Sequence, residues 1–145
     1  MVASSTAGGT GPDAFTRVYW EAAARGRLLL RRCAGCGRAH HYPREFCPFC
    51  WSGDVGWEDA SGRATLYTWS EVHANDLPPF RDRLPYIAAV VDLAEGPRMM
   101  TGVVGCPAAE LRIGMALVVT SATGDTADSL DMLMAAAPLF TPSDR

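Results

Sequence analysis

Four cysteines arranged as two Cys-x-x-Cys pairs are the residues of this sequence best suited to chemistry. Cys33 and Cys36 form the first pair, and Cys47 and Cys50 form the second after ten intervening residues. Two such pairs can supply the four thiolates of a tetrahedral metal site. Because four thiolates leave no coordination position for water, the set indicates structural zinc. Iron is the alternative, since a rubredoxin-like site also uses four thiolates, although rubredoxins usually separate their pairs further.

The other residues with reactive side chains do not suggest a catalytic set. His40 and His41 lie between the cysteine pairs and could replace a cysteine, but we interpret them as ordinary ribbon residues or as donors to the ligands. Cys106 has no cysteine partner and no base beside it in the sequence, which favours a small buried apolar role. Asp92 and Glu95 fit a solvated turn at the end of an expected strand. We therefore do not expect the chain to be an enzyme on its own.

Composition describes one average domain or two very small domains that share a surface. The chain has 145 residues, of which 48% are apolar, and a formal net charge of −3 at pH 7. This acidic balance argues against nucleic acid as a partner, because nucleic-acid affinity comes largely from a basic surface. No apolar run approaches the length needed to cross a bilayer, so we expect no membrane contact.

The start of the chain reads as a disordered tail over residues 1–11, rich in Ser, Thr, Ala and Gly. It lacks the basic start and apolar stretch of an export signal. We therefore expect a cytoplasmic protein, in which thiols stay reduced and paired cysteines are more often metal ligands than disulfides.

A helix and a small β ribbon are the elements expected to position the cysteines. The helix is predicted over residues 12–26, with Asp13 as its N-cap and Gly26 as its stop. The ribbon is predicted over residues 27–60. Its short strands are expected at 27–32, 39–42 and 55–58.

Residues 61–145 contain four or five short stretches with strand character, separated by turn signals, and this pattern predicts a small barrel. The longest expected strand, 64–73, places Thr65, Tyr67 and Trp69 on one face by simple alternation. Further strands are expected at 86–93, 98–104 and 116–121, with one helical turn at 107–111. The stretch 129–140 fits either a final strand or a short helix.

Several motifs occur along the chain in a fixed order. They are Gly-Arg-Leu-Leu-Leu before Cys-x-x-Cys-Gly, Tyr-Pro-Arg before Cys-Pro-x-Cys, Ser-Gly-Arg-Ala-Thr-Leu-Tyr-Thr-Trp-Ser, Pro-Tyr-Ile, Val-Asp-Leu and Leu-Arg-Ile-Gly-Met. This order resembles the acyl-CoA-associated family that joins an N-terminal helix and a rubredoxin-like zinc ribbon to a C-terminal OB-fold. The resemblance runs from about Phe15 to Thr120 and returns at Leu139–Pro142, whereas 122–138 departs from the pattern. It implies a mainly β fold in these three parts.

The resemblance also implies a partner subunit. Family members accompany thiolase-like enzymes, namely thiolases, side-chain-cleaving aldolases of steroid degradation and polyketide acyltransferases. Others are fused to or bound by MaoC-like enoyl-CoA hydratases. The chain is then expected to be a non-catalytic zinc-binding subunit of an acyl-CoA-processing complex in lipid metabolism. In this interpretation the catalytic residues belong to the partner, and the ribbon and OB-fold support the complex and help form the acyl-CoA site.

Two sets of residues are predicted to make these contacts. The loop after the longest strand carries Phe80, Arg81 and Arg83, and arginine offers bidentate contacts to phosphates such as those of coenzyme A. Aromatic side chains often anchor interfaces, so those of the expected helix are predicted to contact the partner. They are Phe15, Tyr19 and Trp20.

Two other functions remain open on the sequence. A nucleic-acid-binding protein could also combine a zinc ribbon with an OB-fold. A rubredoxin-like electron carrier would bind iron at the same four thiolates.

Overall fold

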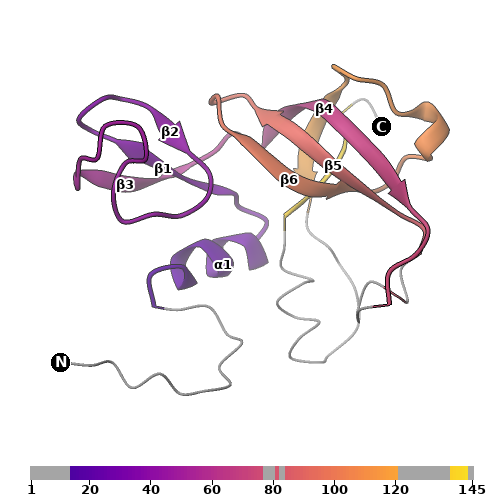
Figure 1. The fold of residues 1–145 in the computed structure, drawn as a ribbon, viewed down its shortest axis with the longest axis horizontal. Helices are drawn as coiled ribbons and strands as arrows, with labels where there is room; N and C mark the ends of the chain where they lie inside the picture. The colour runs from indigo at the N-terminus through magenta and orange to yellow at the C-terminus, as the bar shows by residue number, and fades with distance from the viewer. Residues whose placement is uncertain (1–13, 77–80, 82–83, 121–137, 144–145) are drawn as a thin grey trace.

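The computed structural model describes residues 14–76, 81, 84–120 and 138–143. The expected tail at 1–11 and the expected N-cap Asp13 lie outside these residues. The described elements follow the order α1 (Arg17–Ala24), β1 (Leu29–Cys33), β2 (Ala39–His40), β3 (Val55–Asp59), β4 (Arg63–Val72), β5 (Tyr86–Leu93), β6 (Arg98–Val103), η2 (Ala108–Glu110), β7 (Ala116–Thr120) and β8 (Leu139–Pro142). This mainly β architecture confirms the predicted fold class, with the ribbon on one side of the molecule and the barrel on the other (Figure 1).

Helix α1 lies beside the ribbon and contacts β1 (Figure 1). Tyr19, Ala22 and Ala23 are buried, whereas Val18 is exposed. The helix stops where Gly26 adopts a φ of +77°, a conformation that favours glycine, and its N–H bonds to the carbonyl of Ala23. No helix in the described part of the chain is long and apolar enough to span a bilayer.

The ribbon is a three-stranded antiparallel sheet in the order β2-β1-β3. Arg31 on its central strand is buried, with its guanidinium over the rings of Phe15 at 5.0 Å and Trp57 at 4.6 Å. The same guanidinium donates to the carbonyls of Arg44 and Val55 at 3.3 and 3.1 Å. Arg31 on β1 thereby contacts the segment before the helix, strand β3 and the loop after β2.

The remaining strands form a closed barrel in the order β4-β5-β6-β8-β7, which is the five-stranded OB-fold that the sequence predicted. Strand β8 closes it, antiparallel to β7 and parallel to β6 through the pair of Val103 and Phe140. The part of the ambiguous stretch 129–140 that the structure describes is therefore the start of a strand. Buried residues of α1, β1 and the barrel belong to one continuous core, so ribbon and barrel are held together by packing.

A bulge in β4 corrects one prediction about the faces of this strand. The pairing with β5 shifts between Leu66 and Thr68, so that Tyr67 is exposed and the inward-outward alternation reverses beyond it. Trp69 consequently packs against the core instead of sharing the outer face of Thr65 and Tyr67. Simple alternation was wrong here, because a single extra residue moves every later side chain to the opposite face.

Candidate metal centre

The four cysteines predicted as metal ligands converge at one point of the ribbon. Their Sγ atoms all lie within 4.8 Å of one another. Cys33 and Cys50 are 3.6 Å apart at sulfur, and Cys36 and Cys47 are 3.7 Å apart. A tetrahedron with Zn–S bonds of about 2.3 Å separates its sulfurs by about 3.8 Å. The spacing therefore fits a tetrahedral metal ion, and four protein ligands would close its coordination sphere.

The two knuckles repeat the same backbone hydrogen bonds. In the first, the N–H of Cys33 bonds to the carbonyl of Arg38 at 3.0 Å, and the N–H of Gly37 bonds to the carbonyl of Cys33 at 2.9 Å. In the second, the N–H of Cys47 bonds to the carbonyl of Ser52 at 2.8 Å, and the N–H of Trp51 bonds to the carbonyl of Cys47 at 2.9 Å. Both turns need a positive φ at the fourth residue after the cysteine. Gly37 has +76° and Trp51 has +66°.

Backbone amides directed at sulfur favour thiolates at this centre. The N–H of Cys36 lies 3.4 Å from the Sγ of Cys33 and lowers the pKa of Cys33 to about 7. Burial disfavours the thiolate of Cys47, but the N–H groups of Cys50 and Phe49 outweigh it and lower the pKa of Cys47. The N–H of Ser52 also favours the thiolate of Cys50, yet the neighbouring sulfurs outweigh it and raise the pKa of Cys50. A divalent cation would relieve this mutual repulsion.

Both histidines between the knuckles lie outside the ligand set, in agreement with their interpretation as ribbon residues. His41 is buried between ribbon and helix, where its Nε2 is 2.9 Å from the hydroxyl of Tyr19. Burial, followed by the charge of Tyr42, raises the pKa of Tyr19, so its hydroxyl stays protonated. This contact joins α1 to the segment between the two knuckles.

Acidification is expected to destabilise the fold through His41. Burial, followed by the charge of His40, lowers the pKa of His41 from 6.5 to about 4. Between these values the unfolded chain binds a proton that the folded chain does not. The contribution of His41 to the free energy of unfolding should therefore be complete above pH 6.5. It should decrease as the pH falls toward 4, with a slope of up to about 1.4 kcal/mol per pH unit.

Urea denaturation at a series of pH values measures this slope. The variant His41→Gln should show a shallower dependence than the wild type, and His73→Gln is the matched control because His73 is exposed. Equal slopes for wild type and His41→Gln would contradict the assignment.

The residues predicted to contact a partner or a ligand are placed unevenly. Tyr19 is only 5% exposed, while Phe15 and Trp20 are half-buried against their own chain. Arg81 is exposed. The other two residues predicted to bind ligand, Phe80 and Arg83, lie outside the described residues.

Cys106 packs against the hydrophobic core but is less buried than its expected apolar role implied. It is half-buried, and its Sγ lies 4.0 Å from a carboxylate oxygen of Glu110. It borders a groove of about 840 Å³ between α1, the ribbon and strands β5 and β6. The sequence did not indicate this position, because it depends on how the helix and ribbon pack on the barrel.

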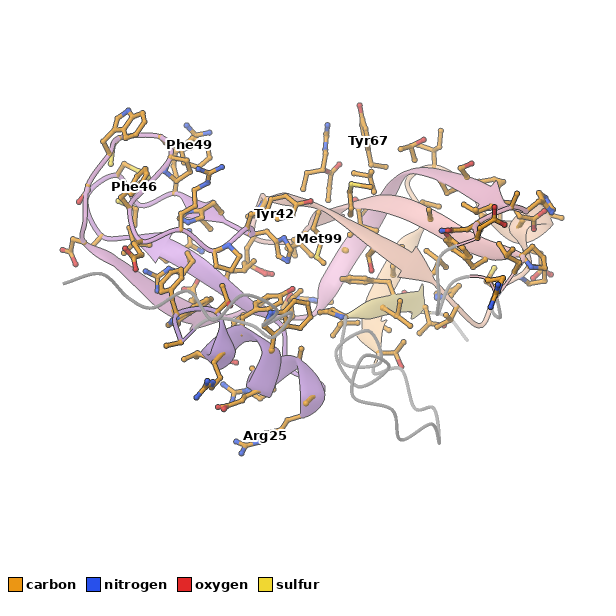
Figure 2. All side chains as sticks on the ribbon, turned by 60° about the horizontal axis from the view of Figure 1, so that its bottom comes forward. Arg25, Tyr42, Phe46, Phe49, Tyr67 and Met99 are labelled. Carbon is orange, nitrogen blue, oxygen red and sulfur yellow. The ribbon has the colours of Figure 1, made fainter. Side chains whose placement is uncertain are left out.

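Sequence reasoning missed an exposed aromatic cluster on the second knuckle, formed by Phe46, Phe49 and Trp51. Trp51 is 74% exposed and stacks on Phe46 with ring centroids 5.3 Å apart. Arg38 from the first knuckle lies over the ring of Phe49 at 3.6 Å. Figure 2 shows Phe46 and Phe49 on the ribbon and Tyr42 where the ribbon meets the barrel. The signal was present, since these aromatic residues directly flank the second cysteine pair.

Comparison with known families agrees with this arrangement. Residues 20–56 match the rubredoxin-like zinc ribbon domain of ChsH2, and residues 57–121 match the C-terminal OB-fold domain of ChsH2. The metal centre is therefore that of a zinc ribbon.

Two relatives and one solved structure extend the match. A protein of Thermomonospora curvata named as a probable enoyl-CoA hydratase alpha subunit is 34% identical over 83% of this chain and 37% of its own length. A DUF35 domain-containing scaffold protein of Methanocaldococcus jannaschii is 35% identical over 61% of this chain and 62% of its own length. This chain thus spans about a third of the first relative and under two thirds of the second.

The structure of an Ltp2-ChsH2(DUF35) aldolase superposes with a TM-score of 0.73 and 31% identity, covering 92% of this chain and 98% of that chain. The combined sequence and structural match covers the helix, the zinc ribbon and the barrel. The chain therefore belongs to the DUF35 family, with the ChsH2 arrangement of a rubredoxin-like zinc ribbon and a C-terminal OB-fold.

Proposed function

We propose that this chain is a non-catalytic zinc-binding subunit of a cytoplasmic acyl-CoA-processing complex. Its partner is either an enzyme with a thiolase-like fold, namely a thiolase, an aldolase or an acyltransferase, or a MaoC-like hydratase. The chain supports that enzyme and helps to form its acyl-CoA site. The observation that carries the proposal is the match over nearly the whole chain of an Ltp2-ChsH2(DUF35) aldolase, a structure whose name joins two proteins. The hydratase alpha subunit and the scaffold protein among the relatives support the same role.

The metal centre suits a supporting role. Four cysteine ligands would leave a bound zinc no open position for water or substrate, so the ion would hold the ribbon in shape. In this proposal the partner enzyme supplies the residues that react with the acyl-CoA. In this proposal Phe80, Arg81 and Arg83 contact the acyl-CoA from the loop between β4 and β5.

The aromatic cluster of Phe46, Phe49 and Trp51 is the surface that we assign to the partner, in addition to the predicted helix residues. Large aromatic side chains are frequent anchors of protein interfaces. Trp51 is also the only non-glycine residue with a positive φ in the described ranges, a conformation that costs an L-residue roughly 1–2 kcal/mol. Keeping a bulky, exposed ring at a position that favours glycine is consistent with a role in binding.

Replacing Trp51 by glycine is expected to weaken the complex without unfolding the ribbon. Glycine accepts the positive φ at this position, so the turn should persist or gain stability. If the ring anchors the interface, its loss should weaken binding of the partner enzyme by about thirtyfold, equivalent to about 2 kcal/mol. Isothermal titration calorimetry with the purified partner measures this change.

Ile113→Ala provides the matched control, because Ile113 is 76% exposed but lies on the barrel between η2 and β7. Unchanged affinity in Trp51→Gly would exclude the aromatic cluster from the interface.

Affinity purification of the tagged chain from its native host, followed by mass spectrometry, tests the proposed function. We expect one thiolase-like or MaoC-like enzyme to copurify in a near-stoichiometric amount. Enrichment of nucleic-acid-associated proteins, or of redox partners in place of such an enzyme, would overturn the proposal.

A further inference from the structure

The four cysteines of the metal centre differ in their accessibility. Cys33 and Cys47, the first cysteine of each knuckle, are completely buried. The second cysteine of each knuckle, Cys36 or Cys50, is exposed. Oxidation of cysteine requires a thiolate that the oxidant can reach, and a cysteine bound to zinc is a thiolate. The two exposed cysteines are therefore the positions at which an oxidant in solution can attack the loaded centre.

Each exposed cysteine contacts a buried cysteine of the other knuckle. The Sγ atoms of Cys50 and Cys33 are 3.6 Å apart. Those of Cys36 and Cys47 are 3.7 Å apart. The sulfurs of a disulfide are about 2.05 Å apart, so each pair has to close by roughly 1.6 Å to become a covalent bond. Both exposed cysteines thus have a neighbouring sulfur that could trap an oxidised form.

The two knuckles are also held against each other by contacts that do not involve the metal. The N–H of Ala34 in the first knuckle bonds to the carbonyl of Asp54, just after the second knuckle, at 2.8 Å. A Cβ at Gly35 would lie 3.3 Å from the Cβ of Ser52, so the two backbones approach closely. These contacts keep the sulfurs of the two knuckles near one another when a bond forms between them.

We propose that the metal centre is a redox switch, in which a peroxide oxidises exposed Cys36 and Cys50 and the buried sulfur beside each one completes a disulfide. The products are the disulfides Cys36–Cys47 and Cys33–Cys50. Disulfide sulfurs lack the negative charge with which thiolates bind a divalent cation, so the oxidised chain releases zinc. The proposal goes beyond the function proposed above and does not depend on the partner enzyme.

The reaction balances with hydrogen peroxide as the oxidant. The thiolate of an exposed cysteine attacks one peroxide oxygen, the O–O bond breaks, and the hydroxide that leaves takes up a proton to become water. The resulting sulfenic acid is attacked at sulfur by the buried thiolate, which forms the S–S bond and expels a second hydroxide that is protonated in turn. Each disulfide thus transfers two electrons from a pair of thiolates to one peroxide, consumes two protons and produces two water molecules.

The oxidised state is expected to be folded and reversible. Both disulfides run from one knuckle to the other, so they replace the link between the knuckles that the metal provides. A thiol reductant breaks both bonds by thiol–disulfide exchange and regenerates the four thiolates. Disulfides that form transiently in a reducing compartment are typical of redox sensors, in agreement with the compartment proposed for this chain.

Treatment of the zinc-loaded full chain with hydrogen peroxide tests the switch. A chelating dye follows zinc release, and mass spectrometry of peptides maps the disulfides. We expect the loss of one zinc ion per chain together with the two disulfides between knuckles, and recovery of zinc binding after addition of dithiothreitol and zinc. Dimedone, which traps sulfenic acids, should label Cys36 and Cys50 and leave their buried partners unlabelled.

Cys106→Ser is the matched control, because Cys106 lies outside the four-sulfur cluster. This variant should release zinc as the wild type does and form the same two disulfides. Retention of zinc at a peroxide concentration that oxidises Cys106 in the wild type would overturn the proposal. Disulfides within a single knuckle, or dimedone on Cys33 or Cys47, would also overturn it.

Discussion

Replacing Cys33 by serine is expected to release zinc and to unfold the ribbon. Cys33 is fully buried, ends the central strand β1, and accepts the N–H of Cys36 at its sulfur. Structural zinc binding contributes on the order of 10–16 kcal/mol in small zinc-finger peptides, so losing one thiolate removes more free energy than this ribbon can replace. Inductively coupled plasma mass spectrometry measures the number of zinc ions per chain. NMR spectra report whether the ribbon has unfolded.

Cys106→Ser is the matched control for this result. Cys106 lies outside the four-sulfur cluster, so the variant should keep one zinc ion per chain and a native spectrum. A Cys33→Ser protein with full zinc content and an ordered ribbon would show that the four-thiolate centre is wrong. Iron in place of zinc in the wild-type chain would instead support the electron-carrier alternative.

Replacing Phe140 by alanine is expected to destabilise the barrel by about 3–5 kcal/mol, the usual cost of deleting a fully buried aromatic ring. Phe140 is completely buried in β8, the strand that closes the barrel. It pairs with Val103 and Val119 on the two neighbouring strands, and its carbonyl accepts the N–H of Val104 at 2.9 Å. Alanine keeps these backbone bonds, so the effect isolates the packing of the ring.

Urea denaturation of Phe140→Ala measures the free energy of unfolding, with Met100→Ala as control. Met100 is 69% exposed on β6, and its truncation should change stability by no more than about 0.5 kcal/mol. A small effect of Phe140→Ala, comparable to that of the control, would mean that β8 does not close the barrel core.

The metal ligands and most strands could be predicted because they depend on local spacing. Cys-x-x-Cys pairs form knuckles whose shape is set by backbone hydrogen bonds within six residues, and Gly26 ends the helix by its own conformation. Strand β5 spans Tyr86–Leu93, the same stretch that was expected as a strand from its sequence. These features need no information from distant parts of the chain.

Features that depend on long-range packing could not be predicted. The bulge at Tyr67 reverses the faces of β4, so Trp69 packs against the core although simple alternation placed it on the same face as Thr65 and Tyr67. The contact of Tyr19 with His41, a histidine 22 positions away, could not be read from the sequence either.

Reconstitution of the partner enzyme with and without this chain tests the central claim most directly. The measurement is acyl-CoA turnover by the purified partner, by this chain, and by the two together at equal concentrations. We expect no turnover by this chain alone, and turnover by the partner that requires the zinc-loaded chain but not its Cys33→Ser variant. Turnover by this chain alone, or partner activity that is the same in its absence, would contradict its assignment as a non-catalytic subunit.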